Sequence, residues 1–337
     1  MNSRNPYSRA KKVLIVVHKE ELLGQAVDIL KRCSITPRIM RPGFCTDWDK
    51  PDTTVVAIGF IQQHLDSIGR DYRPTMIVVD EAHLIPVEVY GRLFKRWPNA
   101  KYIGLTATPA GDDHLVLKEI FGRLVPSWSL RELIDGGWLK DVEYVDAGLD
   151  DRYKQQLASI EGKDEHGDYL ASDIANILDR GVEIERLCQT YLKHANAKRG
   201  VVCAINQEHA QHIAACYERH GVKAAVSMDL STLEGRQQVE NLCNGNLQVL
   251  VDVRQFSDGF RCPDIGFVQL ACPTRLLTTY LHQVEFGMRI EGNGGEEHAT
   301  AKPSGKLIVL DHVGAKETFG LPTDDRDWNV LFAGGKA

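Results

Sequence analysis

Two carboxylates, Asp80 and Glu81, follow directly after the apolar run Met76–Val79. This run is short and rich in β-branched residues, which is typical of a buried parallel strand. In an open α/β sheet, ligands bind at the carboxyl ends of the strands. Carboxylates at that position can hold Mg²⁺ and orient a water molecule toward a phosphate. The pair therefore predicts a metal–phosphate site.

A second group of polar side chains follows the next apolar run, Tyr102–Leu105. Thr106 and Thr108 supply hydroxyl groups on either side of Ala107. If the two runs are neighbouring parallel strands, these hydroxyls lie at the same edge of the sheet as the carboxylates. Oxygen ligands of both kinds suit a magnesium–phosphate complex.

The strings MIVVDEAH and YIGLTATP, which carry these residues, resemble motifs II and III of the superfamily 2 helicases of the DEAD/DEAH-box group. The resemblance implies that Asp80 coordinates Mg²⁺, often through water, that Glu81 also belongs to the metal site, and that Glu81 orients the attacking water. It also implies that His83 and the segment from Thr106 to Thr108 couple the nucleotide to the nucleic acid. The alternative is a surface Asp–Glu pair that only begins a helix, where acidic residues stabilise the first turn.

A basic strand end near the N-terminus resembles motif Ia of these helicases, in the string VLIVVHKEELLGQAVDIL. His18 and Lys19 follow the predicted strand Val13–Val17, and a helix is expected over Glu20–Arg32. The resemblance implies that this strand end meets the nucleic-acid backbone at a helix N-terminus, where amides and the helix dipole attract phosphate. A solvated strand end explains the same residues equally well.

Gly59 and Gln62 follow the next predicted strand, Thr53–Ile58, in a stretch that resembles the motif Ib region. The resemblance implies contact with nucleic acid, because a glycine lets a phosphate backbone approach closely. The family usually has a small residue or threonine where this chain has Phe60. An ordinary helix over Gln62–Ile68 is an equally good explanation of each residue taken singly.

Two strings in the second half resemble motifs IV and V, namely GVVCAINQEHAQHIAACYERHGVKAA and QVLVDVRQFSDGFRCPDI. In motif V, the resemblance implies that Arg254 and Ser257 contact nucleic acid and that Asp258 and Gly259 contact the nucleotide. Arg261 stands where the family usually has a carboxylate that faces the nucleotide ribose. We interpret this departure as drift at a site no longer under catalytic demand.

The string YLHQVEFGMRI aligns with motif VI, whose family pattern is QxxGRGxR. His282 falls at the glutamine and is assigned to the nucleotide, while Glu285 falls at a glycine and Phe286 at the first arginine. The last arginine is kept as Arg289, which the resemblance assigns to catalysis as an arginine finger that stabilises charge on the transferring phosphoryl group. The alternative for Arg289 is a surface cation near a helix end.

Strands alternate with helices along most of the chain, which predicts parallel sheets. The predicted fold class is α/β, with two RecA-like parallel-sheet domains in tandem, the first lacking its phosphate-loop (P-loop) strand. We assign residues 1–12 to a disordered N-terminus, 13–140 to an incomplete first domain and 141–200 to a connector with helices. Residues 200–320 form a second domain, and 321–337 form a tail.

Three predicted helices have specific boundaries. Leu130–Gly137 is capped by Ser129 and is stopped by a pair of glycines. His83–Trp97 contains Pro86, which must lie in its first turn or break it. Leu170–Ala195 is predicted as one helix with a continuous apolar stripe.

The helicase family begins with a Gly-rich phosphate loop, GxxxxGK[ST], and no such string occurs in the 337 residues. The nearest fragment, Pro303–Leu307, lacks the leading glycine and the trailing hydroxyl, and it precedes a strand. In the family this element lies before motif Ia, which here would place it before Met1. We therefore expect the first sheet to lack the strand that usually neighbours the DEAH strand. Either the remaining strands close ranks, or a second polypeptide supplies the missing piece.

Two functions are consistent with these features. In the first, the chain is the larger part of a split or truncated helicase-type ATPase that uses ATP and Mg²⁺ only when the phosphate loop comes from elsewhere. In the second, it is a non-catalytic nucleic-acid-binding or scaffolding pseudo-helicase subunit. Under both, we expect little ATPase activity and no tight ATP binding from this chain alone.

Composition limits the choice of partners only weakly. The formal net charge of -6 and the pI near 6.1 do not point to a nucleic-acid binder, but binding needs only a local basic track. We expect DNA or RNA as partner, single-stranded or at a duplex junction, and no membrane, because no apolar run is long enough to span one. The 8 cysteines show no CxxC pair and no Cys/His cluster at zinc spacing, so we expect reduced thiols and a cytoplasmic location.

Overall fold

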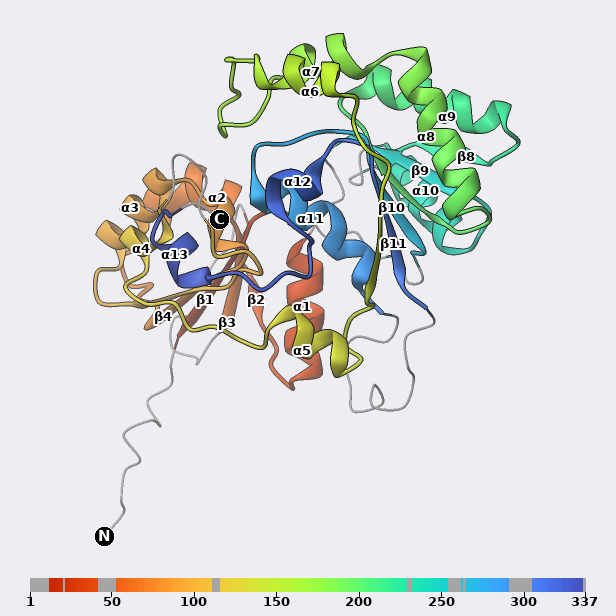
Figure 1. The fold of residues 1–337 in the computed structure, drawn as a ribbon. Coiled ribbons are helices and arrows are strands. Elements are labelled where there is room, and N and C mark those ends of the chain that lie inside the picture. Colours follow the sequence, from red (N-terminus) through yellow and green to blue (C-terminus); the bar gives the residue numbers. More distant parts are fainter. Residues whose placement is uncertain are drawn as a thin grey trace. The chain divides into compact units, whose positions relative to one another are not determined.

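The chain divides into two compact units, each of which is described by itself. Unit 1 comprises residues 1–111, 115–124 and 328–336, and unit 2 comprises residues 112–114, 125–327 and 337. The segment 328–336, which the sequence analysis treats as tail, thus belongs to unit 1. The computed structural model, drawn in Figure 1, describes residues 12–20, 22–41, 53–110, 116–228, 232–253, 262, 265–290 and 305–335.

Unit 1 is built on a five-stranded sheet in the order β2-β3-β1-β4-β5, and all of its strand pairs are parallel. The strands are β1 (Val13–Val17), β2 (Arg38–Ile39), β3 (Thr53–Ala57), β4 (Met76–Val79) and β5 (Lys101–Gly104). Their register pairs Val17 with Ala57 and Val79 with Gly104. The carboxyl ends of these strands therefore lie along one edge of the sheet.

Helices cover both faces of this sheet because alternate strand residues point to opposite sides. On one face, α1 (Leu22–Arg32) packs Leu23 and Val27 against Val17 and Val55. The other face carries the larger core, which includes Leu14, Val16 and Ile77 and is covered by several helices. These are α2 (Ile58–His64), the 3₁₀ turns η1 (Leu65–Ser67) and η2 (Ala82–Leu84), and α3 (Val87–Arg96), with α4 (Leu117–Ile120) and α13 (Trp328–Phe332) packing on each other nearby in the unit.

The DEAH strand β4 has a neighbour on each side, β1 and β5. No gap lies beside β4, so of the two expected arrangements the structure has the one in which the strands close ranks. Within the described residues, the edge strand on this side is β5, whose outer edge pairs with no strand. Ile103 and Leu105 at this edge are 41% and 49% exposed.

Unit 2 is built on a six-stranded parallel sheet in the order β6-β11-β10-β7-β9-β8. All residues of four of its strands are buried, as expected where helices cover both faces. The strands are β6 (Val142–Asp146), β7 (Gly200–Cys203), β8 (Ala224–Val226), β9 (Val249–Asp252), β10 (Phe267–Leu270) and β11 (Leu307–Asp311). Two parallel sheets in tandem confirm the predicted α/β fold class.

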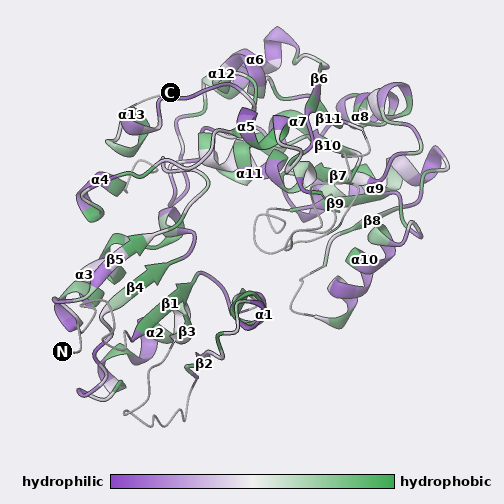
Figure 2. Cartoon of the chain, turned by 90° about the horizontal axis from the view of Figure 1, so that it is seen from below, coloured by the Kyte–Doolittle hydropathy of each residue, from purple (hydrophilic) through white to green (hydrophobic). Residues whose placement is uncertain are grey.

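The core of unit 2 lies between this sheet and the helices α8 and α9, through residues such as Leu187, Tyr191 and Tyr217. Helix α11 packs on β10 and β11. Figure 2 shows the same division by hydropathy, with strands such as β1 and β4 hydrophobic and the helices two-sided. The helices are α5 (Leu130–Asp135), α6 (Asp151–Ala158), α7 (Ala171–Leu178), α8 (Gly181–His194), α9 (Gln207–Arg219), α10 (Leu233–Cys243), α11 (Leu277–Met288) and α12 (Ala315–Phe319).

The helix boundaries follow local chemistry. Ser129 caps α5 in a complete capping box with Glu132, as predicted, and Gly136 ends the helix. Pro86 breaks the helix predicted over His83–Trp97, because it becomes the N-cap of α3. The single helix predicted over Leu170–Ala195 is wrong. The chain leaves the helical conformation at Asp179 and Arg180, so the segment forms two helices, α7 and α8.

The expectation that all the cysteines are reduced is also wrong for one pair. Cys243, at the end of α10, is joined to Cys262 by a disulfide. Cys188, Cys203, Cys216 and Cys272 are buried and belong to no disulfide. The described residues include no helix that is long and apolar enough to cross a membrane.

Candidate functional site

The carboxyl edge of the unit 1 sheet brings together most of the residues predicted from motifs Ia to III. Asp80 and Glu81 follow β4, and Thr106 lies two residues beyond the end of β5. His18 follows β1, and the backbone N–H of Asp80 donates to the carbonyl of Val16 on that strand, at 2.9 Å. The parallel register therefore produces the clustering that the sequence predicts.

Asp80 is positioned as a partly buried carboxylate. Its Oδ1 accepts a hydrogen bond from the backbone N–H of Glu81 at 3.1 Å. Burial raises the pKa of Asp80, and the hydrogen bond from Glu81 opposes that shift only in part. A divalent cation favours the ionised form and would offset the desolvation. The chemistry of this carboxylate thus fits a Mg²⁺ ligand.

Glu81 adopts a left-handed backbone conformation, with φ 47° and ψ 52°. This region is costly for a residue with a Cβ, and strain of this kind occurs often at functional sites. Two hydrogen bonds hold the following residue in place. The Ala82 N–H donates to Leu105 O at 2.9 Å, and the Tyr90 hydroxyl donates to Ala82 O at 2.7 Å. The direction of the Glu81 side chain is therefore fixed by the fold.

His83 connects the DEAH segment to the TATP segment. Its Nδ1 lies 2.8 Å from Thr106 Oγ1, which also accepts a hydrogen bond from the Thr108 N–H at 3.0 Å. His83 Nδ1 also lies 3.6 Å from Glu81 Oε2. Thr108 is only 2% exposed, whereas Ala107 is exposed. These contacts join Glu81, His83 and Thr106 in one partly buried cluster at the sheet edge.

The residues predicted to meet nucleic acid lie at the ends of neighbouring strands. His18 and Lys19 are half-buried between β1 and α1. Gly59 and Gln62 both lie on α2, so the strand predicted to reach Ile58 ends one residue earlier. Gln62 is exposed, and its carbonyl accepts a hydrogen bond from Arg92 at 2.6 Å.

The predicted motif VI residues lie in unit 2, on α11 and at its end. His282 and Arg289 are seven residues apart, which places them two helical turns apart on one side. Arg289 Nη2 lies 3.2 Å from Glu285 Oε1. Glu285, which stands where the family has a glycine, therefore pairs with Arg289, the candidate arginine finger. Arg254, Ser257, Asp258, Gly259 and Arg261 lie outside the described residues.

Gly287 of motif VI has a clear packing role. A Cβ there would lie 2.8 Å from Leu307 Cδ1 and 2.9 Å from Val268 Cγ2. The residue is buried between α11 and the strands β10 and β11. Close helix–sheet approach therefore explains this glycine without any nucleotide contact.

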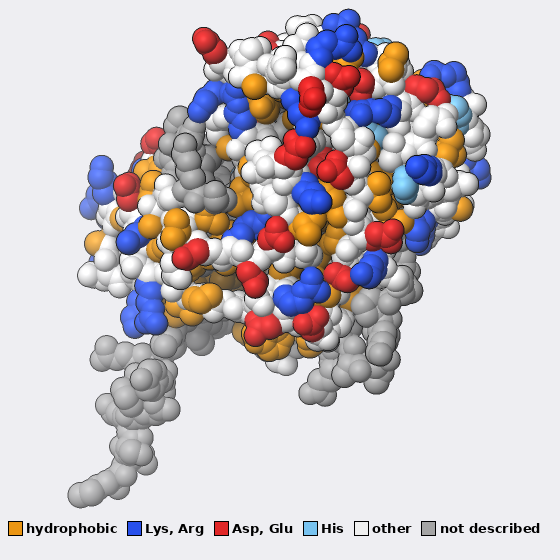
Figure 3. All heavy atoms as spheres, in the orientation of Figure 1, with side chains coloured by type: hydrophobic (Ala, Val, Ile, Leu, Met, Phe, Trp, Pro, Cys, Tyr) orange, Lys and Arg blue, Asp and Glu red, His pale blue; other side chains and the backbone are white. Residues whose placement is uncertain are grey.

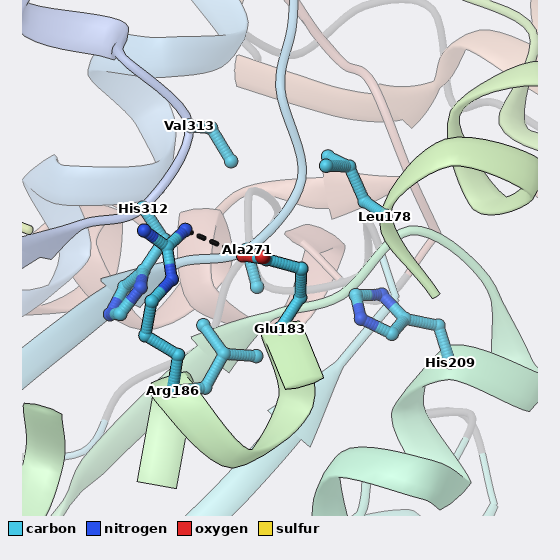
Figure 4. Close-up of a pocket in the computed structure, with 8 residues that line it drawn as sticks. Leu178, Glu183, Arg186, His209, Ala271, His312 and Val313 are labelled. Carbon is cyan, nitrogen blue, oxygen red and sulfur yellow. Dashed lines mark ion pairs between the residues drawn. The ribbon is translucent and has the colours of Figure 1, made fainter. Parts of the chain in front are cut away.

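The sequence analysis missed a narrow pocket in unit 2, shown in Figure 4. Glu183 and Arg186 form an ion pair at 2.7 Å on its wall. Burial lowers the pKa of His209 to about 4 and that of His312 to about 3, so both imidazoles are neutral at pH 7. The pocket thus offers little net charge to a phosphate. Its lining residues are Leu178, Glu183, Arg186, Leu187, His209, Ala271, His312 and Val313.

Comparison with known proteins links the chain to helicase-like proteins. Residues 2–111 match the family described as type III restriction enzyme, res subunit. A 51.5 kDa protein of a Lactococcus phage is 25% identical over 96% of this chain. A candidate ATP-dependent helicase of Saccharomyces cerevisiae, IRC3, is 20% identical over 94% of it. This chain spans 64% and 47% of the lengths of these two relatives.

Solved structures share the fold at lower sequence identity. A fragment of a candidate HsdR subunit of a type I restriction enzyme from Vibrio vulnificus matches with a TM-score of 0.60 and 17% identity, over 93% of this chain and 55% of that one. Dbp5 of Saccharomyces cerevisiae, bound to RNA and ADP BeF3, matches with a TM-score of 0.56 and 14% identity, over 98% and 81%.

The tandem parallel sheets, with the DEAH and TATP segments at one sheet edge, are typical of superfamily 2 helicase-like proteins. The chain is a superfamily 2 helicase-like protein with two RecA-like units, as predicted. Its N-terminal third resembles the res subunits of type III restriction enzymes.

Proposed function

We propose that the chain is the larger part of a helicase-type ATPase that acts on DNA or RNA, single-stranded or at a duplex junction. In this proposal the phosphate loop lies on a polypeptide segment that is not among these 337 residues. The single observation that carries the proposal is the outer edge of β5. Within the described residues it has no partner strand, and it ends beside the DEAH and TATP residues.

An unpaired strand edge exposes backbone groups that a further strand can satisfy. A strand added parallel to β5 would end at the same sheet edge as Asp80 and Thr106. A Gly-rich turn and a helix N-terminus there would surround a triphosphate with backbone N–H groups. The helix that follows could cover the exposed side chains of Ile103 and Leu105. The expected partner is therefore a strand–phosphate loop–helix segment.

In this proposal, several residues of this chain would each have a role toward a bound nucleotide. Asp80, with Glu81 beside it, would hold Mg²⁺, which neutralises phosphate charge when it is bound. Glu81, held in its strained conformation, would orient the attacking water. His83 and Thr106 would relay the change to the segment after β5 through their 2.8 Å contact. Arg289 would act as the finger only after it leaves Glu285.

An ATPase assay with single-stranded DNA or RNA tests the proposal directly. The purified chain alone should show no stimulated turnover above the level of its Glu81→Gln variant. Addition of a strand–phosphate loop–helix polypeptide should produce turnover that Glu81→Gln removes. Turnover by the chain alone that disappears in Glu81→Gln would overturn the claim that the phosphate loop comes from elsewhere.

The second candidate function is a pseudo-helicase that binds or scaffolds nucleic acid without hydrolysis. The pairing of Arg289 with Glu285 favours it, because the carboxylate neutralises the candidate finger. On the face drawn in Figure 3, basic and acidic side chains are interspersed, with no single basic track. Binding of a labelled single strand with a steep salt dependence, weakened by Lys19→Ala, would support a nucleic-acid role under either candidate. A cytoplasmic location is part of the same proposal.

A further inference from the structure

Three side chains with metal-binding chemistry converge where the helices α8 and α9 of unit 2 pack on each other. Glu185 lies on α8, Cys216 lies near the end of α9, and His220 caps that helix. Their ligand atoms all lie within 4.8 Å of one another. None of the three lines the pocket of Figure 4, and none is among the residues assigned to the nucleotide or the nucleic acid, although Cys216 and His220 lie within the string that resembles motif IV.

The distances within the cluster are close to those around a tetrahedral metal ion. Zinc bonds of about 2.0–2.1 Å to nitrogen or oxygen and about 2.3 Å to sulfur place neighbouring ligand atoms about 3.3–3.5 Å apart. Cys216 Sγ lies 3.4 Å from Glu185 Oε2, which already fits. His220 Nε2 lies 2.7 Å from Glu185 Oε1. Entry of an ion therefore requires these two atoms to separate by about 0.6 Å.

The surroundings allow that small movement. The side chains of Glu185 and His220 are 43% and 29% exposed, so both can rotate without disturbing a core. Cys216 is buried, and the neighbouring thiol of Cys188 lies within hydrogen-bonding reach of it. The sulfur is thus fixed, while the two other ligands can adjust.

The combination of ligands indicates which ion would bind. One sulfur, one imidazole nitrogen and one carboxylate oxygen suit Zn²⁺ and disfavour the hard ions Mg²⁺ and Ca²⁺, which take oxygen ligands. Arg219 lies close enough to act electrostatically on the Cys216 thiol, and its positive charge weakens the attraction for a cation. Three protein ligands leave a fourth position for water.

We propose that Glu185, Cys216 and His220 form a Zn²⁺ site that links α8 to α9. Both helices pack on the same face of the unit 2 sheet, and α9 follows the motif IV strand β7. A bound ion would therefore tie the helix after motif IV to the helix before it. The site stands independently of whether the chain hydrolyses ATP.

The test compares zinc binding by the full chain with that of single-residue variants. The reduced, metal-free protein is titrated with Zn²⁺, and with Co²⁺ to detect a thiolate-to-metal absorption band. We expect one high-affinity Zn²⁺ per chain, a thiolate band with Co²⁺, and a Tm that rises with Zn²⁺. His220→Ala should weaken binding by more than about 100-fold, since loss of even a supporting residue costs about 10–100-fold.

The matched control is His212→Ala, which removes another histidine of α9 that pairs with a carboxylate, Asp179, at 2.9 Å. It should leave zinc affinity unchanged. Cys216→Ser should remove the thiolate band, and Glu185→Gln should weaken binding in a protein whose fold is checked by circular dichroism. Equal zinc binding by wild type and His220→Ala, or no binding by wild type, would overturn the proposal.

Discussion

At the scale of single residues, the contact between His83 and Thr106 is the physical link between the DEAH and TATP segments. Thr106 Oγ1 receives the Thr108 N–H and lies 2.8 Å from His83 Nδ1. A threonine whose oxygen serves two buried partners cannot be replaced by an apolar residue without leaving both unsatisfied.

Thr106→Val keeps the shape of the side chain and removes the hydroxyl. We expect the free energy of unfolding to fall by about 1–3 kcal/mol, the cost of leaving buried polar groups without partners. Urea unfolding of the full chain measures it. The control is Thr75→Val, whose hydroxyl donates to Lys12 O in an exposed setting and should cost less than about 0.5 kcal/mol. Equal losses of unfolding free energy in the two variants would contradict a specific stabilising role of the contact between His83 and Thr106.

Asp80 gives a pH-dependent prediction. Burial raises its pKa above the ordinary value of 3.8, so the folded protein binds this proton more tightly than the unfolded chain does. Stability is therefore lost as the pH rises from the ordinary pKa through the raised one. Asp80→Asn should raise the free energy of unfolding at pH 7 by about 0.5–2 kcal/mol, a typical gain at a strained active site.

That gain should shrink as the pH falls through the raised pKa and below 3.8, because wild-type Asp80 is then protonated in both states. Urea unfolding at a series of pH values measures the difference. Asp71→Asn, which changes an exposed carboxylate in the same unit, serves as the control. A gain for Asp80→Asn that is constant with pH would contradict the assignment.

The clustering of the motif II and motif III residues could be predicted from the sequence. Short apolar runs identify parallel strands, and the carboxyl ends of neighbouring parallel strands lie at the same sheet edge. The left-handed conformation of Glu81 could not be predicted, because nothing about a glutamate in a sequence indicates a positive φ. The zinc candidate was also missed. Glu185 and Cys216 are far apart in sequence, and only the packing of α8 on α9 brings them together.

At the scale of elements, the fit of α11 on its sheet depends on one glycine. Gly287→Ala would place a methyl group 2.8 Å from Leu307 Cδ1, and overpacking of this kind costs about 1–3 kcal/mol. Thermal or urea unfolding of the full chain measures the loss. Gly181→Ala, at the start of α8 with nothing within 4 Å of its Cβ, should be neutral or stabilising. A neutral Gly287→Ala would contradict this packing role.

Most elements could be predicted because strand and helix periodicities differ. One error had a local cause that periodicity does not report. The apolar stripe continues from α7 into α8, which hides the break at Asp179 and Arg180. The neighbours of β4 could not be predicted either, because a sequence does not state which strands pair. Sheet order is decided by tertiary packing.

At the scale of the whole molecule, two RecA-like units are present, and among the described residues β5 is the last strand on its side of the unit 1 sheet. The family class follows from the order of motifs along the chain and is supported by the comparisons. The proposed ATPase activity depends on a loop of backbone N–H groups for the phosphates, and no GxxxxGK[ST] string occurs in these residues.

The most direct test of this central claim is the equilibrium binding of Mg²⁺–ATP to the full chain alone. Isothermal titration with and without Mg²⁺ measures it, and Asp80→Asn serves as the control for a specific site. The proposal predicts no Mg²⁺-dependent binding tighter than about 1 mM, equivalent to about -4.1 kcal/mol. A micromolar Kd that requires Mg²⁺ and is lost in Asp80→Asn would contradict it.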